Sequence, residues 1–564
     1  MEALGLQRAK SAPELVGSIS VGLRGGKVHY LVRSGEELYH FWGSSGAESG
    51  PRWVPDEGPK EMKDILSEEL QRFWRGDVLR GQDGSVIRYQ QFGQWSEEEM
   101  GKLVPEASEP TLVKEQDGSV TIRMASEMGR TVLSHHVRLR NDAVPVYMLS
   151  RLNAVGFDPA PRLFGMSYWT RESSVIPWLE ITLLKDGTGP AFKPFLEDLS
   201  KLISEFRGAD GGRTKGLLME LARRDDLVSL HLSREIGRHI GTLHGLIALE
   251  RKERPTRSRA GSGPDIVDLF TPGAMDMESV GALIGRSSLY LGSLKRSLYK
   301  TLGKELDLPE SAGTRKQKVL KRKPSGPSNE MPTLATFLGH LLREEKKVQG
   351  RFGSLRRFVG SPTMISGLDT GLDNIEWDGS GRFTFKRFDW SLHGREAETS
   401  SKLPLLKDLA LFLNSLKKAR YLSVKKEMRD ISRRARKERE VLEVMFIDYN
   451  IAKPAYLQMM TDLGVYSAMG GRQVPFKHIF YLSAPTALWY ERCRNSLISG
   501  YNEGLSATGR EDLLTYPKGV DTLEGIRMMQ VLTALSEASR TLSDPEGPRS
   551  VAGLESELLS ALSP

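Results

Sequence analysis

The chain has 564 residues, too many for one hydrophobic core, so we expect two to four domains. Hydrophobic residues make up 39% and charged residues 27%, which is typical of a soluble globular protein. No signal-peptide pattern and no bilayer-length apolar run is present. The only cysteine, Cys493, excludes internal disulfides and multi-cysteine metal sites, so we expect a cytoplasmic protein without a membrane partner.

The charge balance gives little support for a nucleic-acid partner. Lys and Arg number 80 against 72 Asp and Glu, a net charge of +8, with a pI near 9.2. The excess is small for this length and lies in a few segments, so solvated basic linkers explain it better than a binding groove. A basic protein associated with nucleic acid remains the weakest of the alternatives.

The first part of the chain favours short strands around one helix. Alternating apolar residues occur in two regions between residues 16 and 89, each interrupted by a glycine-containing turn. Between them, residues 60–74 place apolar side chains at helical spacing. We therefore predict a small α+β cap domain over residues 1–105.

Residues 106–190 predict a second, β-rich module. Residues 111–124 form a hairpin with Asp-Gly at its turn, and a helix follows near residues 143–155. Two strands are expected near residues 163–169 and 178–184. This order is that of a kinase N-lobe, with Lys185-Asp-Gly-Thr-Gly189 as the hinge to the next lobe.

Residues 191–564 predict a mostly helical lobe. An apolar stripe at helical spacing runs over residues 232–247, and His244 on or beside it is predicted to be a packing histidine rather than a catalytic one. Residues 251–264 and 309–332 are predicted to be mobile insertions, the second of them basic and turn-rich. Residues 403–416 are strongly apolar and must lie in the core.

Residues 365–390 contain the strongest candidates for functional residues. Asp369 precedes Asn374 by five positions, a turn follows at residues 378–381, and an alternating strand ends on Asp389. Phosphotransferases of the protein-kinase type use one Asp to accept the hydroxyl proton, and an Asn and a second Asp to hold Mg²⁺. The alternative is a polar hairpin loop whose Asp and Asn residues serve turn chemistry.

Several stretches together resemble the maltokinases, sugar kinases of the aminoglycoside-phosphotransferase type. Ser233-Arg-Glu-Ile-Gly-Arg-His-Ile-Gly-Thr-Leu-His244 is similar to their L-G-x-x-T-A-x-L-H helix, and residues 265–272 to their F-T-P. Residues 403–410 are similar to S-P-L-R-D-V-A, and residues 489–501 to the closing W-x(n)-F-L-x-G-Y. The resemblance covers residues 106–503.

The resemblance implies a fold, an activity and a set of site residues. The fold is α+β, an N-terminal cap ahead of a bilobal protein-kinase-like fold with a β-rich N-lobe and a helical C-lobe. The activity is ATP- and Mg²⁺-dependent phosphorylation of a sugar, most simply maltose to maltose 1-phosphate. The predicted residues are a catalytic base, Asp369; two metal ligands, Asn374 and Asp389; a phosphate contact, Arg123; and two sugar contacts, Trp489 and Tyr501. Trp489 has an alternative as a core residue, since its neighbours are apolar at helical spacing.

The chain departs from the family pattern at four places. The family's H-G-D is Gly367-Leu-Asp369 here, and Arg123 stands where a lysine is expected. Pro145 lies near the position of the glutamate that orients this lysine, and the D-F-E-G motif becomes Asp389-Trp-Ser-Leu. Two alternatives therefore stay open: a pseudokinase-type binding or scaffold protein, and a kinase for another sugar or small molecule.

Overall fold

The computed structural model describes most of the chain, which separates into two compact units. The described residues are 14–21, 27–34, 37–44, 59–81, 84–93, 95–104, 109–114, 120–126, 129–135, 138–139, 144–171, 174–184, 189–207, 211–248, 270–305, 345–346, 349–350, 352–365, 368–379, 381–386, 388, 402–437, 476–514, 516–517 and 521–543. The first unit comprises Met1–Thr188, Leu249–Phe270 and Glu376–Ser401. The second comprises Gly189–Ala248, Thr271–Ile375 and Lys402–Pro564.

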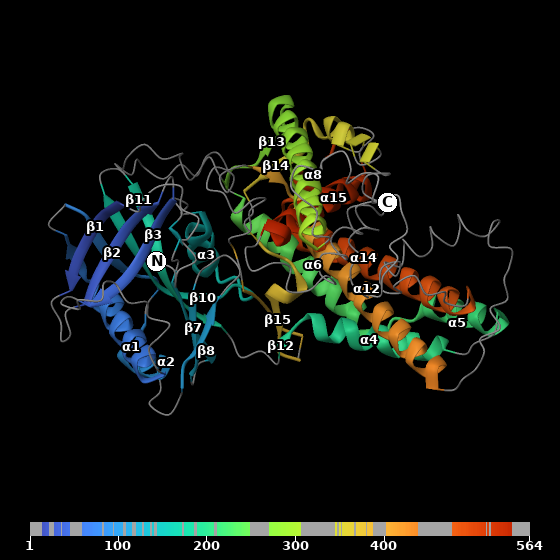
Figure 1. The fold of residues 1–564 in the computed structure, drawn as a ribbon, viewed down its shortest axis with the longest axis horizontal. Helices are drawn as coiled ribbons and strands as arrows, with labels where there is room; N and C mark the ends of the chain where they lie inside the picture. The colour runs from blue at the N-terminus through green and yellow to red at the C-terminus, as the bar shows by residue number, and fades with distance from the viewer. Residues whose placement is uncertain are drawn as a thin grey trace. The chain divides into compact units, whose positions relative to one another are not determined.

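Two antiparallel sheets form the framework of the first unit (Figure 1). One has the order β1-β2-β3-β9, with bounds Glu14–Val21, Lys27–Ser34, Glu37–Ser44 and Arg138–Leu139. The other has the order β4-β5-β10-β11-β8-β7-β6, with bounds Val78–Arg80, Val86–Gln91, Arg162–Arg171, Ser174–Leu184, Gly129–His135, Val120–Ser126 and Thr111–Lys114. The predicted hairpin is present as β6 and β7, which pair antiparallel.

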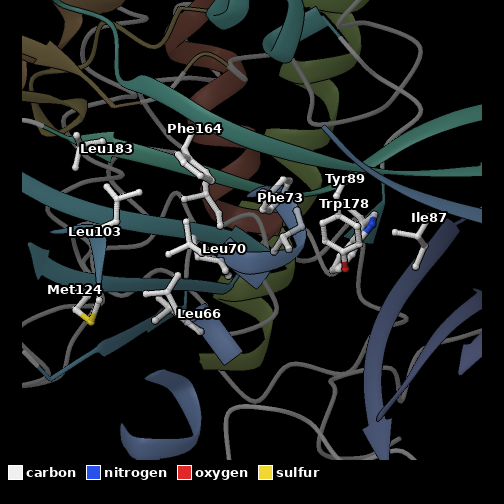
Figure 2. Close-up of a cluster of buried hydrophobic side chains, with 14 of the residues drawn as sticks. Leu66, Leu70, Phe73, Ile87, Tyr89, Leu103, Met124, Phe164, Trp178 and Leu183 are labelled. Carbon is white, nitrogen blue, oxygen red and sulfur yellow. The ribbon is translucent and has the colours of Figure 1, made fainter. Parts of the chain in front are cut away.

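The described helices of the first unit include α1 (Pro59–Arg75), α2 (Glu97–Leu103) and α3 (Val144–Ala154). The predicted helix over residues 60–74 is confirmed as α1, and its apolar stripe packs on the seven-stranded sheet (Figure 2). Phe73 meets the Tyr89 ring edge-on at 5.1 Å. A side chain at Gly165 on β10 would overlap the Phe73 ring, so the close approach of helix and sheet requires glycine there.

Strands from both sides of residue 105 share the seven-stranded sheet, since β4 and β5 precede this position and the other five follow it. The division into a cap and an N-lobe there stays a prediction. The chain leaves the first unit after Thr188 and enters the second at Gly189, close to the predicted lobe boundary at residue 190. Residues 185–188 of the predicted hinge, and the predicted insertions 251–264 and 309–332, lie outside the described residues.

The second unit is mostly helical. Its helices are α4 (Phe192–Phe206), α5 (Gly211–Arg223), α6 (Val228–Ile247), α8 (Met277–Glu305), α12 (Leu406–Lys437), α14 (Phe476–Ala507) and α15 (Thr522–Ser543). Short 3₁₀ segments lie at η4 (Leu355–Phe358), η5 (Leu372–Asn374) and η6 (Glu511–Leu514). Short strands pair in the order β13-β14-β17, with bounds Gly273–Ala274, Pro362–Met364 and Leu403–Pro404. Strand β12 (Gly189–Pro190) also belongs to this unit, β16 (Phe383–Phe385) belongs to the first unit, and β15 (Ile375–Trp377) contains the boundary between Ile375 and Glu376.

Helices α6 and α14 pack backbone against backbone through glycines (Figure 1). A Cβ atom at Gly241 would overlap the Tyr501 carbonyl oxygen, and one at Gly500 would overlap the Arg234 carbonyl oxygen. No residue larger than glycine fits either position without separating the helices.

The predicted core segment over residues 403–416 is confirmed. It forms β17 and the start of α12, and residues 403–413 are all buried. None of the helices in the described part of the chain combines the length and the apolar character needed to cross a bilayer.

Candidate active site

Asp369 and Asn374 lie on one tight loop of the second unit, between β14 and the start of β15. The Asp369 carboxylate accepts a hydrogen bond from the Gly371 N–H at 3.1 Å, and the Asn374 N–H donates to the Gly371 carbonyl at 2.8 Å. A Cβ atom at Gly371 would lie 3.2 Å from Asp369 Oδ1 and 3.5 Å from Asn374 Nδ2. Both side chains therefore border the same small space beside Gly371.

Two hydrogen bonds connect this loop to helix α12. The Thr370 hydroxyl donates to the backbone carbonyl of Asp408 at 2.5 Å, and the Leu372 N–H donates to the Ser415 hydroxyl at 3.2 Å. The two anchors flank Gly371 on either side. Asp369 is consequently carried by a loop tied to a buried helix at two points, and its own side chain is only 8% exposed.

A buried charge network continues from the loop into the core. Lys407 Nζ lies 2.6 Å from Asp408 Oδ1 and 3.5 Å from the Leu368 carbonyl oxygen. The other carboxylate oxygen of Asp408 lies 2.7 Å from His244 Nε2, and His244 Nδ1 lies 3.0 Å from the Tyr501 hydroxyl. When Nε2 carries the proton, it donates to the carboxylate and Nδ1 accepts from the tyrosine. Every side-chain polar atom of His244 thus has a partner.

Burial and neighbouring charges shift the pKa values of Lys407 and Asp408 in opposite directions. Burial lowers the pKa of Lys407, and the carboxylates of Asp408 and Asp369 offset this only in part. Burial would raise the pKa of Asp408, but the Lys407 charge and the His244 hydrogen bond outweigh it and lower the pKa. The structure therefore favours an ionised Asp408 paired with a cation.

The three aromatic and imidazole residues singled out in the sequence are all fully buried. His244 is confirmed as a packing histidine with satisfied hydrogen bonds. The Trp489 indole N–H donates to the Ser229 hydroxyl at 2.9 Å, and its ring lies 6.3 Å from Phe195. Neither Trp489 nor Tyr501 presents a ring face to solvent, so burial supports the packing alternative for Trp489 and a place in the buried network for Tyr501.

Two predicted site residues remain, Asp389 and Arg123, and the structure describes only Arg123. Asp389, the second predicted metal ligand, lies outside the described residues. Arg123 lies on β7, one strand in from the edge strand β6, and is half-buried. Its neighbours Ile122 and Met124 point into the core on the opposite face of the strand. Its contact with ATP phosphates stays a prediction.

Arg130 on β8 is a site candidate that the sequence analysis missed. Counted from the predicted N-lobe boundary at residue 106, β8 is the third strand, after β6 and β7, and protein kinases carry the phosphate-contacting lysine on the third N-lobe strand. Arg130 forms a two-pronged ion pair with Glu376 on β15, with Nη2–Oε2 at 2.7 Å and Nη1–Oε1 at 3.3 Å. The sequence does not predict strand β8, because Thr131 to Leu133 are all buried and the alternating pattern of a half-exposed strand is missing.

The loop fits Mg²⁺ in the type of donor it offers. Within the described part of the chain, no group of three or more His, Cys, Asp and Glu side chains could hold a metal ion. The Asp369 carboxylate and an asparagine amide are nevertheless groups with the hard oxygen donors that Mg²⁺ prefers, and the Asn374 atom nearest to a Cβ at Gly371 is the amide nitrogen Nδ2. The assignment of Asn374 and Asp389 as metal ligands stays a prediction, and Asp389 lies outside the described residues.

Comparison with known proteins shows the fold. No protein-family model matches the chain, and no curated protein matches it in sequence. Among solved structures, glucosamine kinase in complex with glucosamine, ADP and inorganic phosphate matches with a TM-score of 0.53 and 13% identity. The match covers 100% of this chain and 97% of that one. A second crystal form of glucosamine kinase matches with a TM-score of 0.53 and 13% identity, over 99% of this chain and 95% of that one. The chain therefore shares the fold of these glucosamine kinase structures.

Proposed function

We propose that this protein is an ATP-dependent sugar kinase. The observation that carries the proposal is the pairing of Asp369 and Asn374 around Gly371, on a loop tied to α12. The fold of glucosamine kinase supports it, because that protein binds a sugar and a nucleotide within the same architecture. At 13% identity, the likeness concerns the fold and leaves the acceptor to be tested.

In this proposal, Asp369 orients the acceptor hydroxyl and takes its proton as the phosphoryl group moves. Mg²⁺, held by Asn374 and Asp389, would neutralise the charge of the nucleotide phosphates. The chain's own contribution is positioning, because phosphoryl transfer needs little covalent chemistry from the protein. The two anchors from α12 and the hydrogen bond from the Gly371 N–H hold the Asp369 carboxylate in one orientation.

Two sugars are the first acceptors to test. The sequence motifs resemble those of maltokinases, which favours maltose and formation of maltose 1-phosphate. The fold matches glucosamine kinase, which favours an amino sugar. Trp489 and Tyr501 are both fully buried, which supports packing roles, so the proposal rests on neither aromatic ring.

The test is a phosphate-transfer screen with purified full-length protein, Mg·ATP and a panel of sugars, followed by ADP release and by phosphorus NMR of the product. We expect turnover with at least one sugar, and a loss of about 10²- to 10⁴-fold in kcat for Asp369→Asn with little change in KM for ATP. Asp369→Asn that keeps wild-type turnover would remove the residue from the mechanism.

A nucleotide-binding protein without transfer is the second candidate. It is favoured by the sequence of α3, VPVYMLSRLNA, which has no acidic residue to pair with a phosphate-binding cation. Protein that binds Mg·ATP but phosphorylates no sugar or other small acceptor would establish this alternative in place of the kinase.

A further inference from the structure

A phosphate-binding cation in a protein kinase depends on an acidic partner. The lysine of the third strand pairs with a glutamate of the following helix, and this pair must be in place for catalysis. Here the third strand offers Arg130, and the following helix α3 carries no Asp or Glu at any of its eleven positions. The usual partner is therefore missing from this helix.

The structure supplies a partner from elsewhere in the chain. Glu376, two residues after Asn374, receives Arg130 through both of its oxygens, at 2.7 and 3.3 Å. The Glu376 side chain is 9% exposed and that of Arg130 is 27% exposed, so water screens the pair only in part. Lys386 Nζ lies 3.9 Å from the same carboxylate. Two cations therefore lie within 4 Å of the Glu376 carboxylate.

We propose that Glu376 is a positioning residue for Arg130, and that the Arg130 guanidinium so held contacts the phosphates of a nucleoside triphosphate. This inference rests on the proposed function and deepens it. Glu376 takes the part that the helix glutamate plays in protein kinases, from the strand that follows the Asp369 loop instead. Two guanidinium nitrogens, Nη1 and Nη2, face Glu376, and a guanidinium has five N–H groups in a fixed fork, so further donors are oriented by the same contact.

Charge and positioning predict opposite results when Glu376 is neutralised. Glu376→Gln removes a negative charge beside Arg130 and Lys386, so a purely electrostatic role would make Mg·ATP bind more tightly. A positioning role makes it bind more weakly, because the guanidinium loses its two-pronged partner. We expect Glu376→Gln to raise the Kd for Mg·ATP about tenfold in titration calorimetry of the full-length protein, with the Kd of the accepted sugar unchanged. An unchanged or lower Kd for Mg·ATP would overturn the inference.

The chain offers a matched control in the second unit. Glu427 is 8% exposed and pairs with Arg207 at 2.5 Å, so it resembles Glu376 in burial and partner. Glu427→Gln should lower the melting temperature without changing the Kd for Mg·ATP, whereas a merely structural role of Glu376 would give the same result in both variants. Arg130→Lys, which keeps the charge but loses the fork, should weaken nucleotide binding less than Arg130→Ala.

Binding and turnover separate the two hypotheses. Wild-type protein that binds Mg·ATP but transfers no phosphate contradicts the kinase proposal, while the Glu376→Gln titration still decides the role of Glu376. Wild-type protein that does not bind Mg·ATP at all contradicts the Glu376 inference directly.

Discussion

At the scale of single residues, the central feature is a lysine and an aspartate buried side by side beneath the Asp369 loop. Lys407 is 1% exposed and Asp408 is fully buried. Removing one member of such a pair leaves an uncompensated charge, which costs about 3–5 kcal/mol. We therefore expect Asp408→Asn to lose this much free energy of unfolding in denaturant titration. The double variant Lys407→Met/Asp408→Asn should recover part of the loss, and a double variant no more stable than the single one would contradict the charge argument.

The same carboxylate makes stability depend on acid pH. The folded-state pKa of Asp408 lies below its ordinary value, so its ionised form contributes stability above about pH 4. That contribution disappears as the pH falls through the lowered folded-state pKa. The difference in free energy of unfolding between wild type and Asp408→Asn should be constant from about pH 5 to 7 and should shrink below about pH 4. A difference that grows on acidification would have the wrong sign.

A substitution at Trp489 distinguishes a packing role from a role in sugar recognition. Trp489→Phe keeps an aromatic ring in the core but removes the indole N–H that donates to Ser229. The free energy of unfolding should fall by about 1–3 kcal/mol, because a buried hydroxyl loses its partner and the ring becomes smaller. The KM for the accepted sugar should not change, since the side chain is fully buried. A selective rise in that KM would instead return Trp489 to the acceptor site.

At the scale of elements, the closeness of α6 and α14 determines where His244 and Tyr501 meet. Gly241→Ala would push a methyl group into the Tyr501 backbone and should destabilise the protein by about 1–3 kcal/mol or more, measured by thermal or denaturant unfolding. Gly216→Ala on α5 is the matched control, because a Cβ there has no atom within 4 Å. That change should be neutral or stabilise by up to about 1 kcal/mol, since alanine favours the helix. Equal losses at both glycines would show that helix contact is not the cause.

At the scale of the whole molecule, each unit has its own buried core. Phe73 belongs to the aromatic cluster of the first unit, and Leu409 is fully buried on α12 in the second. Multidomain chains commonly depart from two-state unfolding, so calorimetry should resolve more than one transition. Phe73→Ala and Leu409→Ala should each lower a different transition, by an amount that corresponds to about 2–5 kcal/mol. A single transition lowered by both variants would mean that the units unfold together.

The sequence by itself determined the features that depend on neighbouring residues. The apolar periodicity of α1, the apolar run that enters α12 and the stripe that includes His244 are local patterns, and the structure confirms each of them. The closeness of Asp369 and Asn374 is also a local feature, because residues five positions apart on one short loop lie near each other.

Only the tertiary structure decided the features that join distant parts of the chain. Three consecutive residues of strand β8, Thr131 to Leu133, are buried, so its sequence lacks alternation and does not predict the strand that carries Arg130. Arg130 and Glu376 are 246 positions apart, and Trp489 donates to Ser229 across 260 positions. Periodicity reports which face of an element is apolar, but it does not identify the partner across such distances. The sequence around Trp489 is therefore compatible with a sugar site and with the core, and its burial in the structure supports the core.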